Sequence, residues 1–335
     1  MSRIVVLGSG AWGTAIALAL DRRGGHKLTL WAHSPEIARE IAETRENTLF
    51  LPGFPIPEAI EITGSDAAVA NADIVVSVVP SEFLRSTFTR VRSHLHLGQF
   101  IVSATKGIED RTFLRMTQVI SGALEPAGLL LSIGAFSGPS FALEVAQGQP
   151  TAVTVAFSDP EIAALVQQEF SSETLRLYTS TDVVGVELGG ALKNVIAIAA
   201  GIAAGVGLGH NSAAALMTRG IAEITRLAVA CGGRRETLAG LSGVGDLVLT
   251  CTGSLSRNRG VGQALGQGRN LPEILESLGG KVAEGVLTTR AALGLAHRHK
   301  IEMPITEQME LIFNKGKDPR EAIKDLMLRP GKKEH

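Results

Sequence analysis

The sequence predicts an α/β fold in which a doubly wound sheet is followed by an all-helical domain. Through the first half of the chain, short β-branched runs alternate with amphipathic helical stretches, which is typical of a sheet covered by helices on both faces. A glycine-rich turn joins the first such run to the first helical stretch, and almost no strand signal follows residue 180. These observations together predict the fold class.

Several predicted strands are apolar on both faces, which suits parallel strands buried between two helical layers. They lie at Ile4–Leu7, Leu28–Trp31, Ile74–Val79 and Phe100–Ser103, and runs at Leu129–Ile133, Ala152–Ala156 and Leu175–Tyr178 are expected to extend the sheet. The helices between the first strands are predicted at Ala11–Arg22, Pro35–Ala42, Ser81–His94 and Thr112–Leu124.

The second half of the chain has the pattern of helices alone. They are predicted at Val183–Ala204, Ser212–Ala230, Leu271–Ser277, Glu284–His297, Thr306–Asn314 and Pro319–Met327, with glycine-rich interruptions at Gly205–Gly209 and Gly240–Gly245. The change of pattern predicts a dinucleotide-binding domain over residues 1–180 and a helical substrate-binding domain over residues 181–335. No linker rich in Pro or Ser separates them, so we expect the two domains to pack closely.

The composition argues against several classes of function. The 335 residues are 45% hydrophobic and 19% charged, and the net charge of −1 provides no basic surface for nucleic acid. Two cysteines, Cys231 and Cys251, cannot form a disulfide framework or a zinc cluster, so no metal is expected. The longest uncharged stretch, Asn194–Leu208, is shorter than the ~20 residues of a membrane span. With no signal-peptide pattern at the start, we expect a cytoplasmic protein without membrane insertion.

The glycine-rich turn has the spacing of a dinucleotide-binding loop. Gly8, Gly10 and Gly13 follow the first strand directly and open the first helix, which is the context that the G-x-G-x-x-G pattern requires. The first glycine permits a tight turn, the second lets a pyrophosphate approach the backbone, and the third lets helix and strand pack closely. The helix N-terminus then supplies N–H groups for the phosphates.

The end of the second strand leaves the choice between NAD(H) and NADP(H) open. NAD-binding sites usually carry Asp or Glu there for the ribose 2′-hydroxyl, whereas this chain has His33 and Ser34. Either side chain could bind a hydroxyl or a phosphate. His33 could equally be a surface loop residue.

Two segments in the first half follow buried strands, where ligands bind at the carboxyl edge of an open α/β sheet. The first carries Lys106 in Thr105–Glu109, and the second is the turn Gly138–Ala142. A solvated loop lysine and a structural turn are the alternative readings.

Lys193 is the strongest candidate for chemistry. It lies in an apolar helix, where a cation is costly unless it is paired or functional. Gly189 and Gly190 precede it by four and three residues, and we expect them to leave open space beside the lysine stem. Partial burial would lower its pKa toward general acid–base use. The alternative is that the glycines allow close helix packing while the lysine reaches water.

Two further segments offer groups for a phosphorylated ligand. Asp246 follows a glycine-rich turn, and Ser256, Arg257 and Asn258 form a turn that enters a helix. Arginine suits bidentate recognition of phosphate. Taken alone, Asp246 is more often a helix cap and Arg257 a solvated charge.

In order along the chain, these segments resemble the bacterial-type NAD(P)-dependent glycerol-3-phosphate dehydrogenase family. The resemblance covers nearly the whole chain and rests on GSGAWGTA at Gly8–Ala15, NTLFLPG at Asn47–Gly53, SVVPS at Ser77–Ser81, ATKGIE at Ala104–Glu109, SGPSFA at Ser137–Ala142, ELGGALKNVIAIAAG at Glu187–Gly201, LSGVGDLVLTCTGSLSRN at Leu241–Asn258 and VAEGV at Val282–Val286.

The resemblance implies an oxidoreductase that interconverts dihydroxyacetone phosphate and sn-glycerol 3-phosphate with NADP(H) and/or NAD(H), and that supplies phospholipid synthesis. It implies that Lys193 is the catalytic proton donor and acceptor. The substrate residues would be Lys106, Gly138, Ser140, Lys193, Asp246, Ser256, Arg257 and Asn258. The cofactor residues would be Gly8, Ser9, Gly10, Trp12, Gly13, His33, Lys106, Ala142, Arg257, Val282 and Glu284. It also implies a homodimer formed by the helical domain, and stretches such as Val195–Leu208 are expected to pack in it.

Two other functions remain open at this point. A related two-domain dehydrogenase acting on a keto acid or β-hydroxyacid would share the fold and a helical-domain lysine. A non-catalytic dinucleotide sensor would share the glycine-rich loop but would have no use for a buried lysine.

Overall fold

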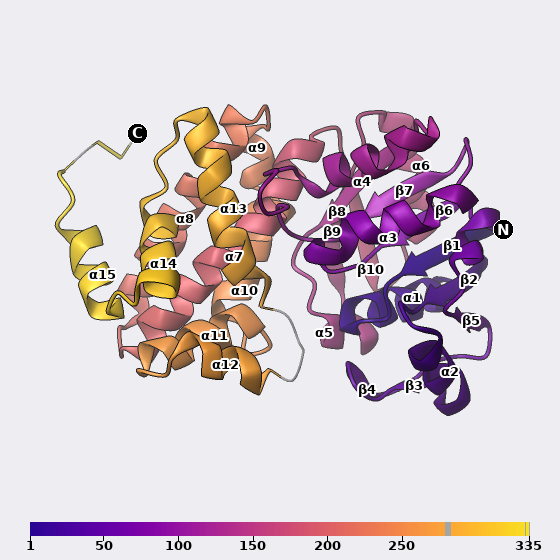
Figure 1. Ribbon diagram of the computed structural model, residues 1–335, viewed down its shortest axis with the longest axis horizontal. Helices are drawn as coiled ribbons and strands as arrows, with labels where there is room; N and C mark the ends of the chain where they lie inside the picture. The colour runs from indigo at the N-terminus through magenta and orange to yellow at the C-terminus, as the bar shows by residue number, and fades with distance from the viewer. Residues whose placement is uncertain (279–282, 332, 335) are drawn as a thin grey trace.

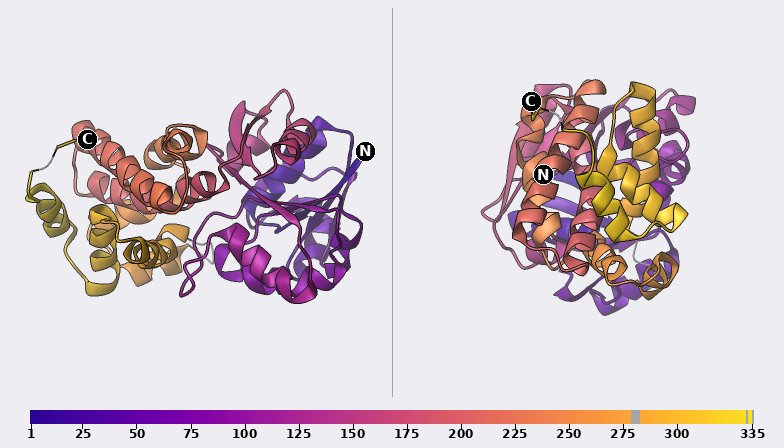
Figure 2. Two further views of the ribbon diagram at one scale, coloured as in Figure 1. Left: turned by 90° about the horizontal axis from the view of Figure 1, so that it is seen from above. Right: turned by 90° about the vertical axis from the view of Figure 1, so that its left-hand side faces the viewer.

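The computed structural model describes residues 1–278, 283–331, 333 and 334, and it shows two lobes side by side (Figure 1). The sheet lobe contains the N-terminus and the helical lobe contains the C-terminus, so the termini lie toward opposite ends of the long axis (Figure 2).

Eight strands form the main sheet, in the order β10-β9-β8-β7-β6-β1-β2-β5. They are β1 (Ser2–Leu7), β2 (His26–Trp31), β5 (Ile60–Thr63), β6 (Ile74–Ser77), β7 (Phe100–Ser103), β8 (Ser132–Ser137), β9 (Thr151–Ala156) and β10 (Leu175–Ser180). A separate antiparallel pair consists of β3 (Glu46–Asn47) and β4 (Leu51–Pro55).

The part of the sheet from β5 to β8 has the strand order of a Rossmann fold. Its strands are parallel, with Ile4 of β1 beside Leu28 of β2 and Ile74 of β6. The direction of winding reverses between β1 and β6, and ligands bind at such a switch point. The α/β prediction is confirmed. The added strands differ in direction, because β9 pairs antiparallel with β8 and β10 then pairs parallel with β9.

Both faces of the sheet are buried because successive side chains of each strand point to opposite sides. In β1, Ile4 and Val6 join one apolar cluster, and Val5 and Leu7 join the other. The first cluster includes α1 (Ala11–Arg23), α2 (Pro35–Thr44), α5 (Ala142–Ala146) and α6 (Pro160–Phe170), and the second includes α3 (Leu84–Val91) and α4 (Met116–Leu124). Short 3₁₀ helices lie at Asp66–Asn71, Ser81–Phe83, Arg92–His94 and Glu125–Ala127.

Beyond Ser180, every regular element in the described residues is helical. The α-helices are α7 (Val183–Gly205), α8 (His210–Ala230), α9 (Arg235–Leu238), α10 (Asp246–Thr252), α11 (Arg257–Gly266), α12 (Leu271–Ser277), α13 (Glu284–His299), α14 (Pro304–Lys315) and α15 (Pro319–Met327), and a π-helical turn, η5, covers Leu241–Gly245. The prediction of an all-helical second half is confirmed for these residues.

Helix α7 is the core of the helical lobe. It is buried from Gly185 to Ala203 and packs against α8, α10, α11, α13 and α14. It is long and apolar enough to cross a membrane, but 89% of its most apolar window is buried inside the protein, as expected for a core helix. The suggestion that Val195–Leu208 packs in a dimer is therefore wrong for most of this stretch, because the same chain already covers Val195 to Ala203.

Glycines let α11 lie directly on α7. A Cβ at Gly201 would be 2.0 Å from the carbonyl oxygen of Arg259, and one at Gly262 would be 1.9 Å from that of Ile198. This backbone-to-backbone packing fixes the start of α11 beside the middle of α7, which is the part that carries Lys193.

Candidate functional site

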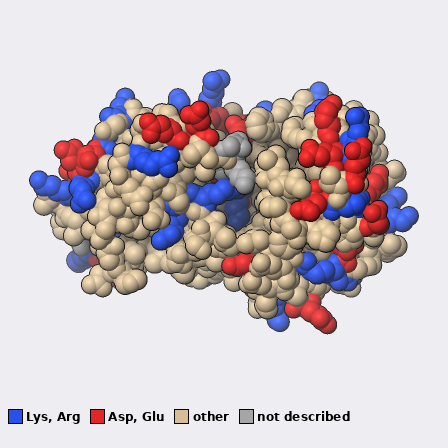
Figure 3. Space-filling model, turned by 90° about the horizontal axis from the view of Figure 1, so that it is seen from below, with Lys and Arg blue, Asp and Glu red and all other residues tan. Residues whose placement is uncertain are grey.

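The candidate residues lie where the carboxyl edge of the sheet faces the helical lobe. Figure 3 shows a hollow between the two lobes with Lys and Arg atoms gathered in it. The chain brings Lys106 there just after β7 and Gly138 just after β8, while the helical lobe contributes Lys193 from α7 and Asp246 from α10.

The glycine-rich loop has the geometry that a dinucleotide needs. Gly8 has a φ of 118° and lies against the backbone of Val78, where a Cβ would be 2.9 Å from the carbonyl oxygen. A Cβ at Gly13 would be 1.8 Å from the Gly8 carbonyl oxygen, so only glycine allows α1 to pack this closely on the turn. A Cβ at Gly10 would meet nothing within 4 Å. This open cradle at the start of α1 fits a pyrophosphate.

Asn47 holds this loop from outside and was not singled out as a site residue. Its buried side-chain amide donates to the carbonyl oxygen of Ser9 at 2.6 Å and to the hydroxyl of Thr14 at 2.9 Å. The sequence places Asn47 in a family motif, but nothing local to it points to the loop nearly forty residues earlier.

The other residues of the cofactor end lie at the same edge. Trp12 is half-buried against Phe136, and His33 is exposed after β2. The Ser34 hydroxyl accepts from the N–H of Ile37 at 3.1 Å, so it caps α2. Ala142 is the first residue of α5. Val282, another expected cofactor residue, lies outside the described part of the chain.

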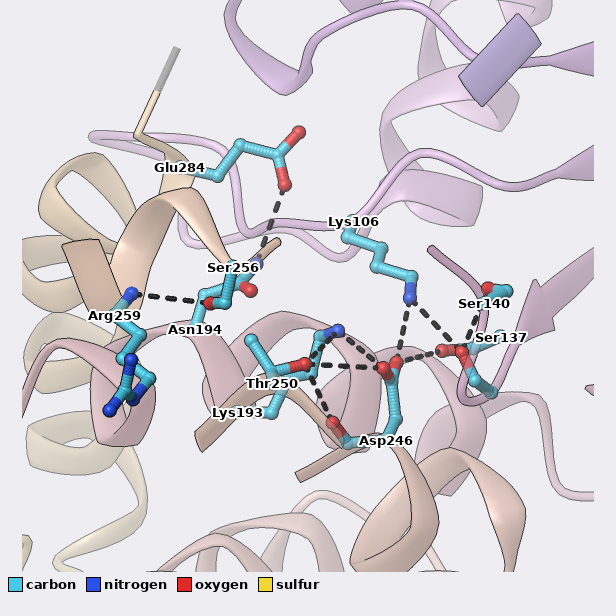
Figure 4. Close-up of polar contacts among 11 residues, drawn as sticks. Lys106, Ser137, Ser140, Lys193, Asn194, Asp246, Thr250, Ser256, Arg259 and Glu284 are labelled. Carbon is cyan, nitrogen blue, oxygen red and sulfur yellow. Dashed lines mark hydrogen bonds and ion pairs between the residues drawn. The ribbon is translucent and has the colours of Figure 1, made fainter. Parts of the chain in front are cut away.

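At the chemistry end, a single carboxylate holds two lysines (Figure 4). Asp246 is fully buried, and its two oxygens pair with the ammonium groups of Lys193 and Lys106, the latter at 2.6 Å. Lys193 also donates to the hydroxyl of Thr250 at 2.7 Å. That hydroxyl donates in turn to the Asp246 backbone carbonyl at 2.6 Å, so it is an acceptor toward Lys193. Thr250 thus belongs to the site, although the sequence did not single it out.

The burial of Lys193 changes its titration. Desolvation lowers its pKa from 10.5 to about 8. The charge of Asp246 acts in the opposite direction, and the charge of Lys106 adds to the lowering. A lysine with this pKa exchanges a proton near neutral pH, which is suited to general acid–base chemistry.

The expected open space beside the Lys193 stem is absent. A Cβ at Gly189 would be 2.5 Å from the carbonyl oxygen of Ser242 in η5, and one at Gly190 would be 2.3 Å from the hydroxyl of Ser137 at the end of β8. These glycines instead let η5 and β8 approach α7, and this approach brings Asp246 to Lys193. The Ser137 hydroxyl, also not predicted, lies 3.4 Å from Asp246 Oδ2.

The turn after β8 completes this side. The Ser140 hydroxyl donates to the Gly138 carbonyl at 2.9 Å, and Lys106 lies 3.5 Å from the same oxygen. Gly138 has a φ of 150°, and a Cβ there would be 2.9 Å from the Cα of Val153 in β9. The turn is therefore held rigidly against the sheet.

The start of α11 faces the same hollow. Ser256 caps the helix by accepting from the N–H of Arg259 at 3.2 Å, and Asn258 accepts from the N–H of Gly285 at 3.0 Å. Arg257 is exposed at the first helical position. Glu284 begins α13, 3.4 Å from the amide of Asn194, and burial raises the pKa of its carboxyl, an effect that the nearby Arg257 charge opposes.

The contacts of Glu187 are with the start of α4 and not with groups beside Lys193. Its buried carboxylate pairs with Arg115 and accepts from the N–H and hydroxyl of Thr117, at 2.7 and 2.8 Å. It therefore ties α7 to the start of α4. Among the described residues no cluster of three His, Cys, Asp or Glu could hold a metal ion.

Comparison with known proteins gives one family over the whole chain. Two family models match, described as the N-terminus and the C-terminus of NAD-dependent glycerol-3-phosphate dehydrogenase, over residues 3–163 and 182–324. Glycerol-3-phosphate dehydrogenase [NAD(P)+] of Koribacter versatilis is 58% identical over 98% of both chains, and that of Acidobacterium capsulatum is 58% identical over 100% of both.

Solved structures agree with this. The crystal structure of glycerol-3-phosphate dehydrogenase from Coxiella burnetii is 37% identical, with a TM-score of 0.92 over 98% of this chain and 99% of that one. A ketopantoate reductase from Ralstonia eutropha, at 17% identity and a TM-score of 0.60, shares only the fold. The chain therefore belongs to the family of NAD(P)-dependent glycerol-3-phosphate dehydrogenases, oxidoreductases that interconvert dihydroxyacetone phosphate and sn-glycerol 3-phosphate.

Proposed function

We propose that Lys193 is the proton donor and acceptor at the C2 oxygen of the substrate. Its buried ammonium group has three hydrogens, and in the described residues Asp246 and Thr250 accept two of them. The third is left for the substrate. In the direction of reduction, charge develops on the C2 oxygen, and Lys193 neutralises it by donating this proton.

Lys106 supports the same step from the sheet lobe. Its ammonium group lies on the other oxygen of Asp246, beside the Gly138 carbonyl. It places a second positive charge near the oxygen that becomes negative, and we assign it a contact with both substrate and cofactor. Asp246 holds the two like charges together.

Phosphate recognition is assigned to the start of α11. Arg257 is an exposed arginine in the first turn of that helix, next to Ser256 and Asn258 in the chain. Phosphate binding remote from C2 holds the carbonyl in place for reaction. Gly138 and Ser140 complete the substrate pocket across the hollow.

The dinucleotide is assigned to the open space beside Gly10, at the start of α1. Gly8, Ser9, Gly10, Trp12, Gly13, His33, Ala142 and Glu284 are assigned to the dinucleotide, with Lys106 and Arg257 shared. When bound, NAD(P)H supplies the hydride that reduces C2. The chain binds and orients it through backbone N–H groups at the start of α1.

We further propose a division of the chain near residue 180, a homodimer and a cytoplasmic location. The sheet ends at Ser180 and α7 begins at Val183. Leu208 and Val229, at the ends of the α8 region, are both partly exposed and suit a contact with a second copy. Light scattering of the purified chain tests the dimer.

The product of the reduction, sn-glycerol 3-phosphate, then supplies phospholipid synthesis.

The test of Lys193 is its replacement by alanine. The rate of NADPH oxidation with dihydroxyacetone phosphate is expected to fall by at least about 10³-fold, because the variant lacks the group assigned to donate the proton to the C2 oxygen. NADPH should still quench tryptophan fluorescence with an unchanged Kd. Intact turnover would exclude the assigned role. The same assay with NADH gives the cofactor preference, and phosphate-free keto acids serve as substrate controls.

Arg257→Ala tests the phosphate site. The expected result is a rise in the KM for dihydroxyacetone phosphate on the order of 100-fold, since a charge-assisted hydrogen-bond pair is lost. Arg269→Ala, an exposed arginine at the end of the same helical region, is the control. An unchanged KM for Arg257→Ala would rule out this phosphate site.

A further inference from the structure

Between β7 and α4 the chain leaves the sheet lobe and lies against the helical lobe (Figure 1). We call residues Lys106–Arg115 the strap. An antiparallel bridge joins Ile108, its third residue, to Arg115, its last. The first residue of the strap, Lys106, is the one that pairs with Asp246.

The middle of the strap is seated on α13. The ring of Phe113 packs against Gly294, where a Cβ would be only 2.2 Å from the ring. The guanidinium of Arg298, one turn further along α13, lies 4.6 Å from the ring centroid and donates to the Thr112 carbonyl at 2.8 Å. Ile108 is buried in the apolar cluster of the helical lobe. The strap is therefore packed on the helical lobe, chiefly on Gly294 and Arg298 of α13.

The same strap is also fixed to the sheet lobe. Leu114, the residue after Phe113, packs into the cluster formed by α3 and α4. Glu109 pairs with Arg85 of α3 at 2.7 Å. Consecutive side chains thus enter the cores of two different lobes.

The strap backbone is strained where it makes this connection. Arg111 and Phe113 have φ values of 69° and 59°, a region that residues other than glycine rarely adopt. Such conformations persist only where the surrounding contacts hold them. A hydrogen bond from the Phe113 N–H to the Glu109 carbonyl holds them here, together with the contacts of Phe113 on α13 and of Leu114 and Glu109 on the sheet lobe.

We infer that Phe113 is a positioning residue for the reaction: by packing on Gly294 and Arg298 of α13, it holds Lys106 against Asp246. The inference rests on the proposed role of Lys106 at the substrate. It makes the placement of this lysine depend on Gly294 and Arg298, which lie outside the residues assigned to substrate and cofactor. Lys106 is held in contact with Asp246 only when the strap packs on both lobes.

A double-mutant cycle between Phe113→Ala and Lys106→Ala tests this. For the reduction of dihydroxyacetone phosphate, Phe113→Ala is expected to lower kcat/KM on the order of tenfold in the wild-type background. It should lower it by less than about twofold when Lys106 is already alanine, because residues that act through one another are not additive. Equal losses in both backgrounds would make Phe113 a purely structural residue and overturn the inference.

Gly294→Ala approaches the same contact from α13 and serves if Phe113→Ala does not fold. Alanine favours a helix, yet its methyl group would displace the ring, so the same dependence on Lys106 is expected. Arg298→Ala should give a smaller loss of the same kind, and Phe113→Leu should restore most of the activity. Arg90→Ala, which removes an arginine stacked on Trp31 at 4.9 Å within the sheet lobe, should show no such dependence.

The experiment distinguishes failure of the role proposed for Lys106 from failure of the inference about Phe113. If Lys106→Ala alone keeps full turnover, the role of Lys106 is wrong and the inference falls with it. If Lys106→Ala is impaired and Phe113→Ala adds its own full loss, only the inference about Phe113 is wrong.

Discussion

At the scale of single residues, the chemistry depends on how Asp246 is placed. Its carboxylate has no exposed surface and compensates two ammonium groups that would otherwise repel each other in a desolvated site. The Lys193 pKa of about 8 is the net result of burial and of Lys106, which lower it, and of Asp246, which raises it. The reaction should follow this balance when pH changes.

In the direction of reduction, Lys193 must be protonated, so the rate should fall as pH rises through about 8. Asp246→Asn removes the negative charge that raises this pKa and keeps the shape of the side chain. The falling limb of the kcat/KM profile for dihydroxyacetone phosphate should therefore move to lower pH. For glycerol 3-phosphate oxidation, which needs neutral Lys193, the rising limb should move the same way. A limb that stays in place would mean that Lys193 does not titrate in this profile.

The sequence predicted some of these residues for a physical reason. A lysine among apolar helical positions indicates a partner or a function, and Lys193 has both an ion pair and a lowered pKa. The sequence could not show what fills the space beside Gly189 and Gly190, because the nearest neighbours, Ser242 and Ser137, are each 53 residues away in the chain. Asn47 and Thr250 were missed for the same reason: their partners are set by tertiary packing.

At the scale of elements, the glycines of the loop serve different purposes: Gly13 is needed for the packing of α1, whereas Gly10 leaves space for the cofactor. Gly10→Ala should leave the thermal unfolding temperature almost unchanged, because its Cβ meets nothing within 4 Å. The added methyl group would occupy the cradle, so the Kd for NADPH, measured by tryptophan quenching, should rise by at least about tenfold.

Gly13→Ala is the matched comparison in the same loop. Its Cβ would be 1.8 Å from the Gly8 carbonyl oxygen, so α1 must shift and the protein should lose stability even without NADPH. If Gly10→Ala binds NADPH as the wild type does, the pyrophosphate does not approach the backbone at this glycine.

How well each helix or strand could be predicted depends on how strong its hydrophobic periodicity is in the sequence. The long apolar helices and the central strands were predicted within a few residues, and α12 and α15 match at both ends. Thr112–Leu124 was predicted as one helix, but α4 begins only at Met116, because the preceding residues form the strap. The strands β3, β4 and β5 and the short helices α5, α9 and α10 were missed, since two to seven residues give little periodicity. The eleven-residue helix α6 was also missed.

At the scale of the whole molecule, the site exists only when both lobes are assembled. Lys106 and Asp246 are 140 residues apart in the chain, and Lys193 lies on a helix that both lobes contact. The doubly wound order explains one half of this arrangement, because it brings the ends of β7 and β8 to one edge. The other half depends on how α7 docks on that edge, for which the sequence carries no periodic signal.

The buried pair of Glu187 and Arg115 is the polar contact that should dominate this docking. Glu187→Ala leaves a guanidinium that is only 16% exposed without its counter-charge, so we expect the free energy of unfolding to fall by about 3–5 kcal/mol. Because α4 and α7 belong to different lobes, calorimetry should also show the single unfolding transition separating into two.

Glu302→Ala provides the contrast, since Glu302 pairs with Arg329 at 3.1 Å on the surface of the helical lobe and should cost less than about 1 kcal/mol. Saturating NADPH and glycerol 3-phosphate bind both lobes, so they should bring the two transitions of Glu187→Ala back together. A variant that unfolds in one transition at the wild-type temperature would show that apolar packing alone holds the lobes, and that the buried pair contributes nothing to their cooperativity.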